Sequence, residues 1–182
     1  ELQSQDGRYI RPIMVIRVER TGKDQRDGQK IHALDARDYL IERLSVREEE
    51  IRIKSSETDE LGDTDLFDPL CPVKYIITKE ALQEGWDCSF AYVLALLDKT
   101  TAQTAMTQMI GRVLRQPDAR STTIEALNQC YVFCYDQDVS EAVENVRKGL
   151  EEEGMTGLGE FVRAEGGGNS SNDDSADLLT VK

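Results

Sequence analysis

The sequence contains a single histidine, His32, and its four cysteines form no C-x-x-C pair. Structural zinc sites usually combine four Cys and His ligands at short spacings, so this composition disfavours one. The cysteines are Cys71, Cys88, Cys130 and Cys134, and the last two lie in the apolar run CYVFCY. Buried free thiols in a reducing compartment such as the cytoplasm are therefore expected.

Long apolar runs are also missing. No window approaches 18 consecutive apolar residues, the length that would indicate a transmembrane helix. The first ten residues, ELQSQDGRYI, contain neither the basic segment nor the apolar stretch of a secretory signal peptide. They contain no Met either, which favours a fragment of a longer polypeptide.

Positive charge is scarce, with 22 basic against 35 acidic residues and a net charge of −13. This argues against a general polyanion-binding surface, although it leaves room for a locally basic loop or groove. Residues 151–182 contain eight acidic and two basic residues, so nearly half of the excess lies there. This segment includes GGGNSSNDDSAD, and we predict that 161–182 is a flexible acidic linker or tail.

The sequence also lacks a complete nucleotide-binding motif of the P-loop type, G-x-x-x-x-G-K-[ST]. The pair Gly22-Lys23 is followed by Asp24 and has no glycine five residues before it. Asp59 and Glu60 resemble a Walker B pair, but they follow the polar stretch KSSET instead of an apolar strand. No convincing set of metal-dependent nuclease residues is found.

What the sequence does contain is a regular alternation of strand and helix patterns. Apolar or alternating runs predict strands at 11–19, 51–55, 73–78, 91–97 and 130–135. Apolar residues at helical spacing predict helices at 30–45, 101–115 and 139–153. Most of the strands are apolar on both faces, so we predict an α/β domain over 1–160, with a parallel sheet between two layers of helices.

One face of the predicted helix at 101–115 is polar and includes Gln108, Gly111, Arg112 and Arg115. A glycine inside a helix costs about 1 kcal/mol relative to alanine and often marks the close approach of another group. Guanidinium groups match phosphate oxygens in a bidentate geometry. The pattern therefore favours a phosphate-bearing ligand, and the alternative is an ordinary solvated helix face.

A second segment, 77–97, places Thr78 at the end of a strand and the tetrapeptide EGWD before the next one. Gly85 and Asp87 belong to that tetrapeptide. In parallel sheets, ligands bind beyond the carboxyl ends of the strands, where Thr78 is expected. The alternative for EGWD is a turn with a packed Trp86, which leaves the charged neighbours unexplained.

Together, T-x₅-EGWD-x-strand and Q-x-x-G-R-x-x-R resemble motifs V and VI of superfamily 2 helicases and translocases. ALQEGWDCSFAYVLALL followed by QMIGRVLRQPDA is most similar to the helicase subunit of type III restriction endonucleases. The resemblance covers about 10–155 in the expected order and implies the second RecA-like domain, with RPIMVIRVE as its first strand. Ser89 stands where relatives often have proline, which is a conservative departure in a turn.

The resemblance implies roles for the residues of the predicted helix. Arg112 and Arg115 would be arginine fingers on the γ-phosphate of ATP, and Gln108 would lie at the same interdomain cleft. Gly111 would allow the facing domain and its nucleotide to approach. ATP and Mg²⁺ would be held mainly by an N-terminal P-loop domain of the same polypeptide, so the isolated chain is expected to be inactive.

The resemblance also implies further contacts and partners. Gly85 and Asp87 would lie beside the nucleotide, while Thr78 and, more weakly, Ser55 or Ser56 would contact nucleic-acid phosphates. DNA is favoured over RNA, a methylation or specificity subunit is a further expected partner, and a bacterial cytoplasm is the expected location. The alternatives are a repair or RNA helicase without a nuclease, and a non-catalytic interaction domain of the same fold.

Overall fold

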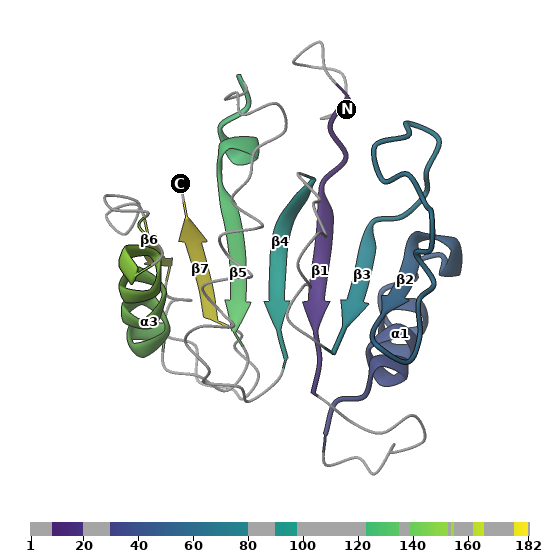
Figure 1. The fold of residues 1–182 in the computed structure, drawn as a ribbon, viewed down its shortest axis with the longest axis horizontal. Helices are drawn as coiled ribbons and strands as arrows, with labels where there is room; N and C mark the ends of the chain where they lie inside the picture. Colours follow the sequence, from purple (N-terminus) through teal and green to yellow (C-terminus); the bar gives the residue numbers. More distant parts are fainter. Residues whose placement is uncertain are drawn as a thin grey trace.

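The computed structural model of the protein describes residues 9–19, 30–79, 90–97, 123–134, 139–152, 154, 162–165 and 177–181. Within these residues, the strands form one sheet in the order β2-β3-β1-β4-β5-β7-β6 (Figure 1). The strands are β1 (Ile13–Arg17), β2 (Ile51–Lys54), β3 (Tyr75–Thr78), β4 (Ala91–Leu96), β5 (Cys130–Cys134), β6 (Val162–Glu165) and β7 (Asp177–Val181). The helices are α1 (Ala33–Glu42) and α3 (Val139–Glu152), with short 3₁₀ turns η1 (Glu48–Glu50) and η3 (Glu125–Asn128).

The first five strands are parallel to their neighbours, as the sequence predicts. All five predicted strands and the predicted helices at 30–45 and 139–153 are confirmed, with ends that differ by a few residues. The predicted helix at 101–115 lies outside the described residues. The fold is therefore an α/β fold of the RecA-like, three-layer type, built on a parallel five-stranded sheet.

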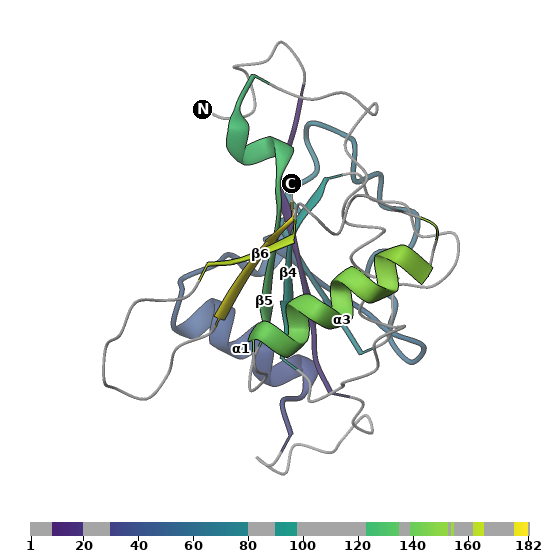
Figure 2. The ribbon, with the colours of Figure 1, turned by 90° about the vertical axis from the view of Figure 1, so that its left-hand side faces the viewer.

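Apolar side chains cover both faces of this sheet. Val15 belongs to one cluster of buried residues together with Val143 of α3, whereas the adjacent Ile16 belongs to a second cluster with Leu40 of α1. Successive side chains of a strand point to opposite faces, so the two helices cover opposite sides of the sheet (Figure 2). Burying one such aliphatic side chain stabilises the fold by about 1.5–3 kcal/mol. A strand buried on both faces gains this at successive positions, so its sequence is a nearly continuous apolar run.

A reciprocal cap starts α1. The Nδ1 atom of His32 accepts a hydrogen bond from the backbone N–H of Leu34 at 3.1 Å. In return, the Asp35 carboxylate accepts one from the backbone N–H of His32 at 3.0 Å. These bonds satisfy amide groups at the start of the helix that have no partner within it. Because α1 follows β1 and precedes β2, the cap also fixes where the chain leaves the carboxyl edge of the sheet.

The segment predicted as a flexible tail contributes two strands. β7 pairs antiparallel with β5 and β6 pairs antiparallel with β7, which extends the sheet beyond β5. For residues 162–165 and 177–181 the expectation of a flexible tail is therefore corrected. The physical reason is that the outer edge of β5 presents unpaired amide and carbonyl groups, and DLLTV offers apolar and β-branched residues suited to pair with it. The division into a domain at 1–160 and a separate tail stays a prediction.

None of the described helices combines the length and the apolar character needed to cross a bilayer. Of the cysteines, Cys130 is a buried free thiol, and Cys71 is free and half-buried. Burial raises the pKa of the Cys130 thiol to about 12. The expectation of buried free thiols is confirmed for Cys130.

Candidate functional site at the carboxyl edge of the sheet

The strand order defines where a ligand site is expected. The chain runs from β1 to β2 and β3 on one side of the sheet, and then crosses to β4 and β5 on the other. This reversal places a topological switch point between the carboxyl ends of β1 and β4, the usual position of ligand sites in open α/β sheets. The sheet register aligns Arg17 at the end of β1 with Thr78 of β3 and with Leu96 of β4.

Thr78 lies at this edge, as predicted. Its register partner in β2 is Lys54, and its carbonyl accepts a hydrogen bond from the backbone N–H of Val18 at 2.9 Å. The residue is only 3 % exposed, so its hydroxyl group is held within the end of the sheet. Thr78 is the last residue of β3, as predicted, and its contact with a phosphate stays a prediction.

Ser55 and Ser56 follow β2 and share this corner with Thr78, because Lys54 and Thr78 are register partners. The Ser55 hydroxyl accepts hydrogen bonds from the backbone N–H groups of Glu57 at 3.3 Å and Thr58 at 3.1 Å. These bonds close a tight turn, so Ser55 shapes the loop. Ser56 is exposed on the same turn. Of the two serines, Ser56 is the one whose hydroxyl is presented to solvent.

Ion pairs fasten the acidic loop at 57–60 to the sheet and to α1. Glu57 pairs with Lys79 at 3.2 Å, immediately after β3, and Asp59 pairs with Lys54 of β2. The Lys54 ammonium lowers the pKa of Asp59, with help from the backbone amides of Gly62 and Leu61. In this arrangement, the loop carboxylates neutralise two of the lysines at the carboxyl edge.

The pair Asp59-Glu60 is structural, as expected from the polar stretch that precedes it. Glu60 pairs with Arg37 of α1, and its Oε2 atom also accepts a hydrogen bond from the backbone N–H of Ile53 at 2.8 Å. Asp59 is bound to Lys54. Both carboxylates therefore have partners that hold the loop, and neither belongs to a Walker B pair.

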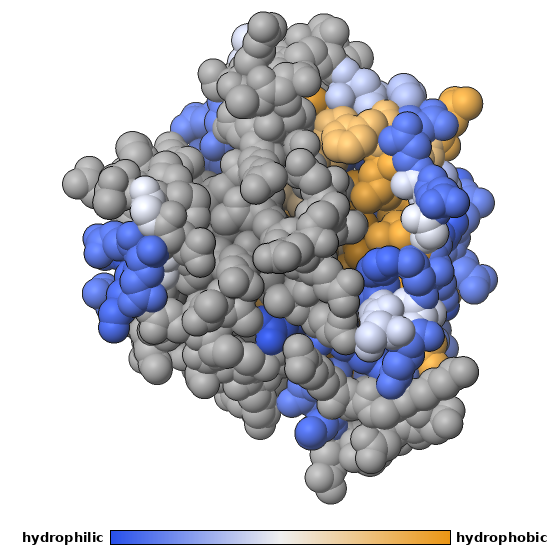
Figure 3. Space-filling model, viewed as in Figure 1, coloured by the Kyte–Doolittle hydropathy of each residue, from blue (hydrophilic) through white to orange (hydrophobic). Residues whose placement is uncertain are grey.

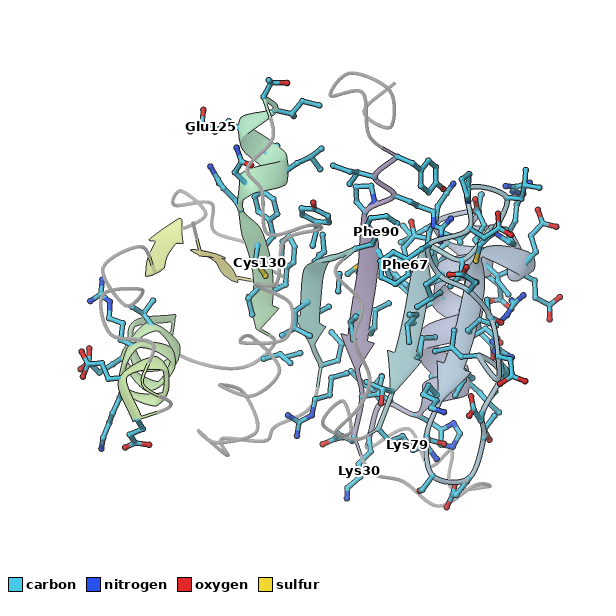
Figure 4. All side chains as sticks on the ribbon, turned by 45° about the horizontal axis from the view of Figure 1, so that its top comes forward. Lys30, Phe67, Lys79, Phe90, Glu125 and Cys130 are labelled. Atoms are coloured by element: carbon cyan, nitrogen blue, oxygen red, sulfur yellow. The ribbon has the colours of Figure 1, made fainter. Side chains whose placement is uncertain are left out.

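Several cations near this edge do not stand out in the sequence. Arg17 and Lys79 are buried at the carboxyl ends of two apolar strands. Arg17 is the last residue of β1, and Lys79 directly follows β3. Lys30 is exposed before α1, and Figure 4 shows it at the same end of the sheet as Lys79. Their position at the end of a buried strand is the signal that could have identified Arg17 and Lys79, since parallel strands present such residues together.

The remaining predicted site residues are Gln108, Gly111, Arg112, Arg115, Gly85 and Asp87, and they all lie outside the described residues. The structure does show where their segments begin. Residues 80–89 follow the carboxyl end of β3, and residues 98–122 follow that of β4. β1 is the one strand between β3 and β4 in the sheet. Both segments therefore begin at the carboxyl edge of the sheet. One begins on the β3 side of β1 and the other on the β4 side.

A metal site can be assessed only in the part of the chain that the structure describes. Within that part, no group of three or more His, Cys, Asp or Glu side chains is arranged to hold a metal ion. Of the basic side chains at this edge, Arg17 and Lys79 are buried, Lys54 and Lys79 pair with carboxylates, and Lys30 is exposed. The sequence has no P-loop to cradle a triphosphate.

Comparison with protein-family models, with curated proteins and with solved structures finds no match to this chain.

Proposed function

We propose that this chain is the second RecA-like domain of an ATP-dependent DNA translocase or helicase of the type III restriction kind. The observation that carries the proposal is the sheet order. In this order, β3 and β4 lie on either side of β1. The segment that contains EGWD begins after the carboxyl end of β3, and the segment that contains Q-x-x-G-R-x-x-R begins after that of β4. In an open α/β sheet this is the edge at which a nucleotide and a nucleic-acid backbone would be met.

In this proposal, Arg112 and Arg115 offset the negative charge that develops on the γ-phosphate during phosphoryl transfer. Arginine fingers contribute about 10³–10⁵ in rate in other phosphoryl-transfer systems. Gln108 lies at the same cleft, and Gly111 lets the facing domain approach. Bound ATP with Mg²⁺ supplies the phosphoryl group, and both are held mainly by a P-loop domain elsewhere in the polypeptide.

The nucleic-acid track in this proposal starts at the corner of β2 and β3. Ser56, which is exposed, and the exposed Lys30 at the same end of the sheet contact phosphates, and the predicted contacts of Ser55 and Thr78 lie at the same corner. Phosphate contacts position a nucleic acid without reading its sequence. The preference for DNA over RNA therefore comes from the resemblance to restriction subunits.

The test uses the full-length polypeptide that contains this chain. Arg112→Ala and Arg115→Ala are expected to lower DNA-stimulated ATP hydrolysis by about 10³-fold or more, with most ATP binding retained. Arg43→Ala, at an exposed arginine that follows α1, is the matched control and should leave turnover unchanged. Near-normal turnover in both finger variants would contradict the proposal. Repeating the assay with single-stranded RNA separates the DNA motor from an RNA helicase.

A further inference from the structure

The edge of the sheet opposite the candidate site carries an exposed apolar surface. Phe67 is 46 % exposed and Leu70 is 89 % exposed, and both lie on the loop between β2 and β3. The Phe67 ring packs against the Phe90 ring with 5.1 Å between their centroids. The Tyr9 ring also packs against Phe90, with 6.0 Å between their centroids. Figure 4 shows Phe67 and Phe90 side by side at this end. Figure 3 shows apolar surface there in orange, bordered by hydrophilic residues in blue.

This loop is held in place from beneath by Arg11, which is only 2 % exposed. Its NH1 group donates hydrogen bonds to the carbonyl of Cys71 at 2.7 Å and to that of Asp68 at 3.0 Å. Its NH2 group donates to the carbonyl of Leu66. One buried guanidinium thus ties three backbone carbonyls of the loop to the start of β1. The exposed apolar side chains are therefore presented by an anchored loop.

Two aspartates fix the backbone of the same two apolar residues. The Oδ1 atom of Asp65 accepts a hydrogen bond from the backbone N–H of Phe67 at 2.8 Å. The Oδ1 atom of Asp68 accepts one from the backbone N–H of Leu70, also at 2.8 Å. Each apolar residue is thus preceded, two positions earlier, by a carboxylate that closes a local turn. A surface that is ordered before binding loses less conformational entropy when a partner docks.

The exposed charged side chains of the loop from Leu61 to Val73 are all negative, and the positive charge of Arg11 is buried beneath it. Asp63, Asp65 and Asp68 are all exposed, and the sequence from Leu61 to Val73 contains no Lys or Arg. We propose that Phe67 and Leu70, with these three aspartates, form a docking surface for a basic segment of a partner protein that carries an apolar anchor. The apolar side chains supply the contact, and the carboxylates select lysine or arginine beside it.

Charge complementarity decides between this occupant and the others. A second copy of the chain, docked with two-fold symmetry, would bring the same three aspartates against one another. DNA, RNA and an anionic membrane would be repelled by the same carboxylates. The surface also lies at the amino ends of the parallel strands, away from the carboxyl edge. A docked partner is therefore compatible with the proposed function, and the inference does not depend on it.

A defined peptide probe tests the surface. The probe is a fluorescein-labelled 16-residue helical peptide made of Lys and Leu. The first comparison peptide replaces each Lys with Glu, and the second replaces each Leu with Ser. Fluorescence anisotropy with the purified chain should show binding of the Lys-Leu peptide alone. Binding of the Glu-Leu peptide with equal affinity would contradict the charge argument.

Variants of the apolar residues locate the binding. Phe67→Ser and Leu70→Ser are expected to weaken binding of the Lys-Leu peptide by about tenfold or more each. Tyr39→Ser and Leu44→Ser remove exposed apolar side chains of comparable size elsewhere and should leave the affinity unchanged. Equal losses in both pairs, or no loss in the first pair, would overturn the assignment. Thermal denaturation of each variant checks that it remains folded.

Variants of the acidic residues separate selective docking from general attraction to a negative protein. Asp63→Asn, Asp65→Asn and Asp68→Asn in combination remove the charge, while asparagine can still accept the two turn hydrogen bonds. The triple variant should bind the peptide about tenfold more weakly and with a smaller dependence on salt. The charge-matched control replaces the exposed Glu42, Glu48 and Glu144 with Gln. A control as weak as the test variant would show non-specific attraction and overturn the proposal.

Direct binding experiments decide between occupants. Labelled single-stranded DNA, and vesicles containing phosphatidylserine, are each mixed with the chain without the peptide, because either polyanion would bind the cationic peptide itself. Neither should bind in a way that depends on Phe67. Sedimentation of the chain across a hundredfold range of concentration should show no self-association that depends on Phe67. Binding of DNA or vesicles that is lost in Phe67→Ser, or a dimer lost in Phe67→Ser, would assign the surface to that occupant instead.

Discussion

The carboxylate of Glu50 holds the residues before β2 and β3 together, and its lowered pKa makes the stability of the fold depend on pH. Glu50 is 7 % exposed and forms ion pairs with Lys74, at 2.5 Å, and with Arg47, at 3.0 Å. The Lys74 ammonium, followed by the Arg47 guanidinium, lowers the pKa of Glu50 to about 2. Its carbonyl also accepts a hydrogen bond from the backbone N–H of Lys74 at 2.8 Å, so both ends of the residue join β2 to β3.

The lowered pKa predicts how this residue responds to acid. A carboxyl group whose pKa is lower in the folded state stabilises that state above its unfolded value, near 4.5, and the contribution is lost as pH falls towards 2. Both cations are partly exposed, so solvent screening limits the contribution to about 1–2 kcal/mol. Glu50→Gln should lower the free energy of unfolding at pH 7 but have little effect near pH 2, as measured by urea denaturation.

The exposed neighbour Glu48 provides the control for this prediction. Glu48→Gln should leave the unfolding curve at pH 7 within about 0.5 kcal/mol, because surface substitutions away from special contacts rarely exceed that value. Equal effects of the two substitutions at pH 7 would show that Glu50 has no special role.

At the scale of elements, the cap of α1 makes a separate prediction. His32→Ala removes the Nδ1 acceptor for the Leu34 amide and should lower stability by about 1 kcal/mol. His32→Asn restores a side-chain acceptor at the same position and should recover much of the loss. Thermal denaturation of both variants measures the difference. If both variants lost the same stability, the loss would come mainly from the packing of the buried imidazole and not from the cap.

The strands differ in how well the sequence predicts them, for a physical reason. The parallel strands are buried on both faces, so runs such as AYVLALL carry their own signal in hydrophobicity and length. β6 and β7 are four and five residues long. β7 depends on pairing with β5, which is distant in sequence, and β6 depends on pairing with β7. Their flanks, including GGGNSSNDDSAD, favour a linker, and no local pattern indicates that Asp177 pairs with Cys134.

Some features of the candidate site could likewise be predicted from the sequence, and others could not. That Thr78 ends a strand at the ligand edge follows from the apolar run before it, and the structure agrees. Its burial, and the pairing of Lys79 with Glu57, depend on how the loop after β2 folds back, which no local spacing indicates. Arg11 shows the same limit, because its role arises from carbonyls more than fifty residues away in sequence.

At the scale of the whole molecule, the proposed function predicts that the isolated chain is inactive, because its sequence contains no P-loop. In that proposal, the arginine fingers would stabilise charge on a phosphoryl group that a P-loop outside this sequence holds. The purified chain should therefore hydrolyse ATP no faster than a buffer blank, with or without DNA, in a coupled phosphate-release assay. The full-length polypeptide under the same conditions is the positive control and should show DNA-stimulated turnover.

ATP hydrolysis by the isolated chain that persists in an Arg112→Ala, Arg115→Ala double variant would place a complete active site within these 182 residues and refute the half-site proposal. Hydrolysis that disappears in the double variant would keep the arginines in the reaction but remove the need for a second domain.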